Sequence, residues 1–136
     1  MYEPIRTKSV HALADPGDFP HRSREEELDI QLAGHLAALL AVTDELRALS
    51  AEPGLDAAAE QLAAQVARLR GGLPPVRASV ATAIHEPHVA ALHQRAHALA
   101  GRALVVAASR ADTGAAILAA RRMEAHAEAA HLVPAA

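Results

Sequence analysis

Alanine dominates this chain, and aromatic side chains are nearly missing from it. Alanine fills 36 of the 136 positions, whereas Tyr2 and Phe19 are the only aromatic residues. Alanine is the best helix former, while the β-branched and aromatic residues that favour strands are scarce. The composition therefore predicts an all-α fold. Its core would consist of small aliphatic side chains, so the helices must approach one another closely to exclude water.

The charge pattern and the lack of cysteine narrow the class of protein. The formal net charge is −3 with neutral histidines. Basic residues are scattered, and the Arg121–Arg122 pair alone suggests a DNA contact, so nucleic-acid binding is disfavoured. Without cysteine, the chain has no disulfide, thiolate metal site or cysteine nucleophile. No signal stretch opens the chain, and no apolar run approaches the roughly 20 residues of a membrane span. We therefore expect a cytoplasmic protein that does not enter membranes.

Residues 1–22 differ from the rest of the chain. They hold Pro4, Pro16 and Pro20 and show no helical periodicity, which predicts an extended N-terminal arm. Residues 23–136 are long enough for one helical-bundle domain. Both aromatic residues lie in the arm. They either cap an apolar groove, on this chain or on a neighbouring one, or belong to a frayed terminus.

The first helix has the clearest start signal. Ser23 followed by Glu26 is typical of a capping box, and an apolar seam then runs to about Leu49 before the helix-breaking sequence at 50–54. His35 occupies one step of this seam. The seam residues, spaced by three and four, are Leu28, Leu32, Leu39, Val42, Leu46 and Leu49. This spacing predicts a central helix or one at an oligomer interface.

Three further helices follow from the same periodicity. They are expected from residue 55 to the glycine pair at 71–72, from 74 to 109, and from 112 or 113 to about 131. Pro87 removes a backbone hydrogen bond, so the third helix should be kinked or split near this residue. Short loops between amphipathic helices favour an antiparallel, up-down-up-down four-helix bundle.

Histidines concentrate in the third predicted helix, and one pair suggests a metal site. His93 and His97 are four residues apart and therefore share a helix face. If the last two helices form a hairpin, His97 faces Glu124 and His93 faces Glu128. Two imidazoles and two carboxylates at matched heights suit iron, zinc, nickel or manganese. The competing interpretation is a set of ordinary interhelical pairs on the flank of the seam.

The remaining histidines have simpler explanations. His35 in the seam is expected to be a hydrogen-bonded core residue or a device that sets helix register. His85 and His88 flank Pro87, and we expect them to satisfy the carbonyl groups that the proline leaves free.

No sequence pattern for nucleophilic catalysis or phosphate binding is visible. Apolar side chains outside the seams exceed what one protomer should hide; they are Leu36, Leu40, Leu104, Val105, Ile117 and Leu118. We therefore expect a non-enzymatic helical interaction or regulatory module, without a cofactor, that forms a homodimer and has a protein partner. The alternative hypothesis is a metal-binding bundle that uses His93, His97, Glu124 and Glu128.

Overall fold

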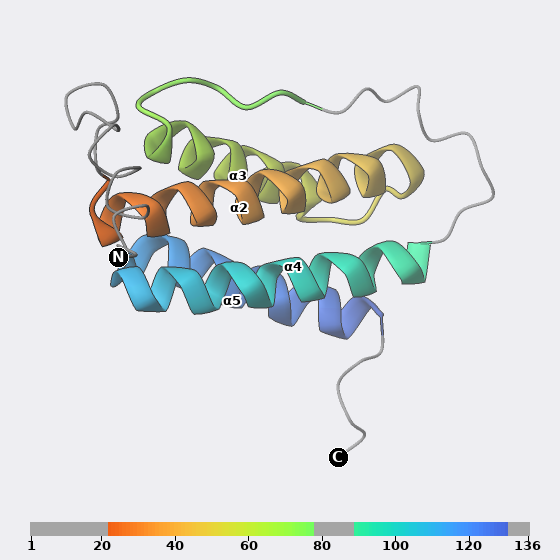
Figure 1. The fold of residues 1–136 in the computed structure, drawn as a ribbon. Helices are drawn as coiled ribbons and strands as arrows, with labels where there is room; N and C mark the ends of the chain where they lie inside the picture. Colours follow the sequence, from red (N-terminus) through yellow and green to blue (C-terminus); the bar gives the residue numbers. More distant parts are fainter. Residues whose placement is uncertain (1–21, 78–88, 131–136) are drawn as a thin grey trace, which may run out of the picture.

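Four α-helices make up the computed structural model, which describes residues 22–77 and 89–130 (Figure 1). The helices are α2 (Arg24–Leu49), α3 (Leu55–Leu69), α4 (Val89–Arg110) and α5 (Thr113–Ala129). The described residues contain no strand, so the predicted all-α four-helix fold is confirmed. Residues 1–21 of the predicted arm and the predicted kink at Pro87, with His85 and His88, lie outside the described residues.

The predicted capping box starts α2. The Glu26 backbone N–H donates to Ser23 Oγ at 3.1 Å, and the Ser23 N–H donates to Glu26 Oε1 at 2.8 Å. Such a cap is worth about 1 kcal/mol. Glu25, Glu26 and Glu27 add favourable negative charge at the positive end of the helix dipole. The sequence therefore predicts this helix start correctly.

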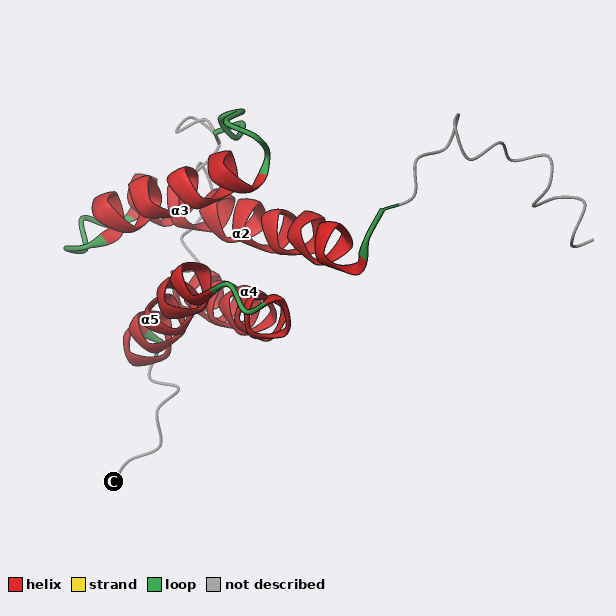
Figure 2. Ribbon diagram, turned by 90° about the vertical axis from the view of Figure 1, so that its left-hand side faces the viewer, coloured by secondary structure: helices red, strands yellow, loops and turns green. Residues whose placement is uncertain are grey.

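The helices form two hairpins that lie against each other. The first consists of α2 and α3, the second of α4 and α5, and the main contact between the hairpins joins α2 to α4. Figure 2 shows the α2–α3 hairpin from the side and the α4–α5 hairpin closer to end-on, so the two hairpins cross obliquely. Contact between α3 and α5 is slight. The bundle is therefore organised around the α2–α4 pair.

One connection differs from the predicted up-down-up-down order. Arg47 near the end of α2 pairs with Asp56 at the start of α3, and Arg110 at the end of α4 pairs with Asp29 at the start of α2. Both α3 and α4 are thus antiparallel to α2, and they run in the same direction (Figure 1).

This difference arises because the third helix does not start at Pro74, where the sequence predicts it to begin. Residues 73–77 are not helical, and α4 begins only at Val89. Leu73 and Pro74 both precede a proline, which disfavours helical backbone and favours extended chain. Arg77 then reaches Asp44 of α2 with two hydrogen bonds of 2.9 and 2.8 Å. The segment after α3 therefore runs back along the first hairpin instead of starting a helix at once.

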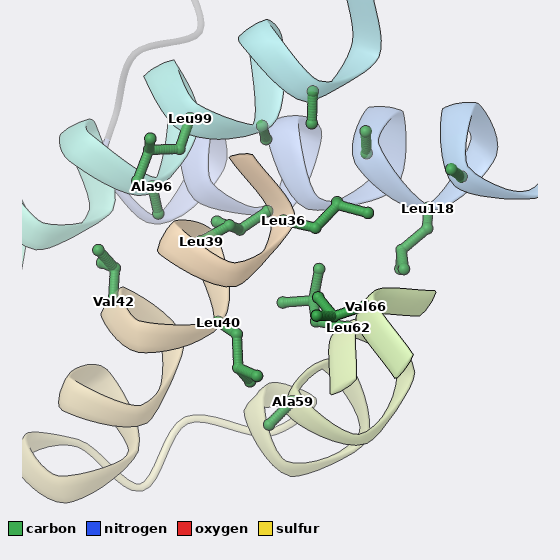
Figure 3. Packing of buried hydrophobic residues seen from close by; sticks show 14 of the residues in the cluster. Leu36, Leu39, Leu40, Val42, Ala59, Leu62, Val66, Ala96, Leu99 and Leu118 are labelled. Carbon is green, nitrogen blue, oxygen red and sulfur yellow. The ribbon is translucent and has the colours of Figure 1, made fainter. Parts of the chain in front are cut away.

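Leucines of α2 fill the core between the hairpins (Figure 3). Leu40 lies on the side of α3, and Leu39 lies on the side of α4. The facing positions on α4 and α5 are small and fully buried: Ala96, Ala100, Ala103, Ala107, Ala115 and Ala119. Large side chains from one helix thus pack against alanines of the opposite hairpin, as the composition requires. His35, expected in the seam, is only half-buried.

Candidate functional site

Four polar side chains meet at one end of the bundle, and we call them the Glu–His–His–Arg cluster. They are Glu52 from the α2–α3 loop, His93 from the start of α4, and Arg122 and His126 from the second half of α5. His126 is 0% exposed and His93 is 2% exposed. Buried polar groups of this kind are rare unless they are hydrogen-bonded to one another.

The four side chains form a continuous chain of contacts. His93 Nε2 lies 2.9 Å from Glu52 Oε2, and the Nδ1 atoms of His93 and His126 are 2.9 Å apart. His126 Nε2 lies 3.3 Å from Arg122 Nη2, and Ser50 Oγ donates to Glu52 Oε2 at 3.0 Å. Each imidazole therefore has a partner at both ring nitrogens.

One arrangement of protons satisfies the whole chain. Arg122 can only donate, so His126 Nε2 accepts and the proton of neutral His126 resides on Nδ1. That proton is donated to His93 Nδ1, which leaves the His93 proton on Nε2, facing the Glu52 carboxylate. All three hydrogen bonds then point from Arg122 toward Glu52. The cluster consists of a cation, two neutral imidazoles and an anion.

Burial and neighbouring charge shift the pKa values of Glu52, Arg122 and His126. Burial, followed by the charge of Arg122 and the proximity of His93, lowers the pKa of His126 to about 4. Burial also lowers the pKa of the Arg122 guanidinium, although Glu52 opposes this change. Burial raises the pKa of Glu52, but hydrogen bonds from His93 and Ser50 bring it below its ordinary value. At neutral pH His126 is therefore uncharged and Glu52 is ionised.

A cavity of about 480 Å³ adjoins the cluster. Its polar wall consists of Glu52, His93, Arg122, His126 and Glu128, and its apolar wall consists of Pro53, Leu55, Ala125 and Ala129. This volume lies within the range of roughly 300 to 1,000 Å³ that is typical of small-molecule sites. A cavity with converging polar groups and perturbed pKa values is a candidate binding site.

The predicted metal ligands occupy different environments. His93 belongs to the cluster, whereas His97 Nδ1 lies 3.0 Å from the Met123 carbonyl oxygen and so donates to it. Glu124 and Glu128 are exposed, and of these two only Glu128 lines the cavity. The described residues include no group of three or more side chains suited to hold a metal. The structure thus brings His93 and Glu128 to one cavity and leaves His97 and Glu124 outside it.

Three members of the cluster were not predicted from the sequence. His126 had a detectable signal, because it follows Ala115 and Ala119 at helical spacing on the buried face of α5. Arg122 was considered only together with Arg121, as a surface contact for DNA. An arginine at the edge of an apolar helix face is expected to be exposed, so the sequence does not indicate that Arg122 joins a buried cluster. Glu52 lies in a loop, where no periodicity indicates its direction. Only the tertiary contact between the two hairpins brings it to His93.

An apolar groove lies at the opposite end of the α4–α5 hairpin. It has a volume of about 370 Å³ and is lined by Ala107, Ala108, Ala111, Asp112, Thr113, Ala116, Ile117 and Ala120. Ile117 is 47% exposed beside it, and Val105 of α4 is 66% exposed. The predicted apolar surplus is smaller than expected, because Leu36, Leu40 and Leu118 are buried within the protomer. Leucines on two sides of α2 pack against α3 and against α4, whereas the predicted seam covers only one side of the helix.

Among the described helices, none is both long and apolar enough to span a membrane. Comparison of the chain with protein-family models, with curated proteins and with solved structures finds no match.

Proposed function

We propose that this chain is a non-enzymatic helical interaction module that self-associates through the outer surface of the α4–α5 hairpin. The observation that supports this proposal is the alanine-lined groove with the exposed Ile117 at its edge. Exposed aliphatic side chains beside an apolar groove are typical of protein–protein contact surfaces.

The chemistry of this surface favours a second copy of the chain as the occupant. Most of the groove is lined by alanines, whereas Ile117, which also lines it, is a large and half-exposed side chain. In a two-fold dimer each surface meets its own copy, so one Ile117 would enter the groove of the other protomer. The same patch thus supplies both the projection and the depression that accepts it. We expect a homodimer with the two α4–α5 hairpins at its centre.

Sedimentation velocity on the full chain tests the proposal. The wild type should sediment as a dimer at tens of micromolar, and Ile117→Glu should shift it to monomer, because a carboxylate in the apolar contact stays unpaired. Val76→Glu is the matched control, since Val76 is 94% exposed on the segment after α3, away from the groove. It should leave the dimer intact. A monomeric wild type, or equal effects of both substitutions, would refute the proposed interface.

The metal-binding alternative retains one supporting observation, which is that His93 and Glu128 line the same cavity. It predicts stoichiometric iron, zinc, nickel or manganese in protein purified without a histidine tag. His93→Ala combined with His97→Ala should then reduce the metal content, as measured by elemental analysis. Metal-free wild type, or unchanged content in the double variant, removes this alternative.

A further inference from the structure

Arg122 carries a positive charge that its protein surroundings only partly satisfy. Its Nε atom is buried without a hydrogen-bond partner among the described residues, and its Nη2 has only the long 3.3 Å contact with an uncharged imidazole. The described residues give it no ion pair with a carboxylate. Arg122 is partly buried, and a partly buried guanidinium ordinarily pairs with an anion. Arg122 also lines the 480 Å³ cavity.

We infer that this cavity binds a small monocarboxylic acid, whose carboxylate pairs with Arg122 and whose apolar body lies against Leu55 and Ala125. A guanidinium binds a carboxylate through charge-assisted hydrogen bonds, which are stronger than hydrogen bonds between neutral groups. Arg122 is therefore a cation at the cavity for which the described residues supply no paired carboxylate.

The other residues of the cavity restrict the ligand to a single negative charge. Glu52 is ionised and already accepts hydrogen bonds from His93 and Ser50, and the Glu128 carboxylate lies at the same cavity. A phosphate or dicarboxylate would bring further negative charge close to both of them. The apolar wall, formed by Pro53, Leu55, Ala125 and Ala129, suits a hydrocarbon body. Together these features select an amphipathic monocarboxylate.

This site is independent of the proposed dimer contact. The cavity lies where α4 begins and α5 ends, whereas the groove lies at the turn between these helices. The monomeric variant Ile117→Glu should therefore bind a carboxylate as well as the wild type does. Failure of one proposal leaves the other unaffected.

Benzoate is a suitable probe, with inorganic phosphate and the uncharged benzyl alcohol as comparisons. Isothermal titration calorimetry on the full chain should show saturable benzoate binding in the roughly millimolar range or tighter, as expected for so small a ligand. Benzyl alcohol and phosphate should bind at least about tenfold more weakly, because each lacks one half of the recognised chemistry. Equal binding of benzoate and benzyl alcohol, or no saturable binding of benzoate, would overturn the inference.

Two adjacent arginines provide a charge-matched pair of variants. Arg122→Gln should weaken benzoate binding at least about tenfold. Arg121→Gln removes the same charge from an exposed position and should leave the affinity nearly unchanged. Equal losses in both variants would show non-specific attraction and contradict the assignment.

A third variant covers the case in which Arg122→Gln fails to fold. Ala125→Leu is at an exposed helical position and fills the apolar side of the cavity without a change of charge. It should fold, as checked by circular dichroism, and weaken benzoate binding by a similar factor. Unchanged affinity in the folded Ala125→Leu variant would place the ligand elsewhere and refute the site.

Discussion

Two residues, Gly71 and Ala111, occupy the same position in two helix-ending turns. After α3, the Gly72 N–H donates to the Ala67 carbonyl with Gly71 at φ 71°, and after α4, the Asp112 N–H donates to the Ala107 carbonyl with Ala111 at φ 60°. Both are Schellman motifs, in which glycine is the usual residue at the left-handed position. Alanine pays a steric cost there that glycine avoids.

Reciprocal substitutions should therefore have opposite effects. Ala111→Gly should raise the free energy of unfolding by up to about 1 kcal/mol, and Gly71→Ala should lower it by about 1 kcal/mol. Urea denaturation followed by circular dichroism measures both changes. A Cβ at Gly71 would meet nothing within 4 Å, so the expected loss reflects backbone conformation alone. Destabilisation by Ala111→Gly would contradict the argument.

His126 should make the stability of the fold depend on pH. Its pKa is about 4 in the folded protein against an ordinary value of 6.5, so between these values the unfolded chain binds more protons. Stability should be full above pH 6.5 and should fall by about 3 kcal/mol as the pH drops to 4. The comparison of wild type with His126→Asn in urea denaturation at several pH values isolates this contribution. Parallel pH profiles of the two proteins would disprove it.

At the scale of elements, the Asp44 carboxylate of α2 binds the segment 73–77 that follows α3. Asp44 is 7% exposed and accepts hydrogen bonds from Arg77 and from Arg47, the latter at 3.0 Å. The hydrogen bond to Asp44 raises the pKa of the Arg77 guanidinium above its ordinary value. The pKa of the Arg47 guanidinium is also raised, first by its hydrogen bond to Asp56 and then by that to Asp44. The attachment keeps the returning chain against the first hairpin.

Removal of this carboxylate should loosen the connection between the hairpins. Asp44→Asn retains the size of the side chain but loses the charge, and we expect it to cost about 2 kcal/mol of stability, as for hydrogen bonds to charged groups. Hydrogen exchange should increase at the amides of Leu73, Val76 and Arg77 more than in the core of α2. Asp56→Asn is the control, because its carboxylate is largely exposed and its pair with Arg47 contributes little. Equal losses in the two variants would contradict a special role for Asp44.

At the scale of the whole molecule, self-association links stability to protein concentration. If the dimer forms through the α4–α5 groove, association stabilises the folded state and Tm should rise with concentration. Ile117→Glu should abolish this dependence, whereas Val76→Glu should preserve it. Differential scanning calorimetry over a wide concentration range provides the measurement. A wild-type Tm that does not change with concentration would argue against the dimer.

Local signals in the sequence predict much of this fold. Ser23 and Glu26 define the start of α2, and Asp112 caps α5 by accepting from the Ala115 N–H, because capping depends only on residues three positions apart. The hairpin of α4 and α5 also follows from a short turn. Its predicted register is nearly correct, since His97 contacts Met123, one residue from the expected Glu124.

The candidate site was only partly predictable. His93 was selected for its spacing from His97, yet its partners are Glu52 and His126, which lie on two other segments. Helix periodicity gives the direction of a side chain to within a broad arc, which does not distinguish the flank of a helix from its buried face. Within this arc, the same histidine can be either an exposed metal ligand on the flank of the helix or a buried imidazole that is hydrogen-bonded inside the fold.

The sequence by itself determined the all-α class, the caps of α2 and α5 and the turn between α4 and α5, because these depend on contacts between neighbours along the chain. The tertiary structure decided the relative direction of α3 and α4 and the partners of His93. Both depend on contacts between segments far apart in the sequence, such as Arg77 with Asp44 and His93 with Glu52. The packing of the two hairpins also partly buries Arg122 and places Glu52 beside His93.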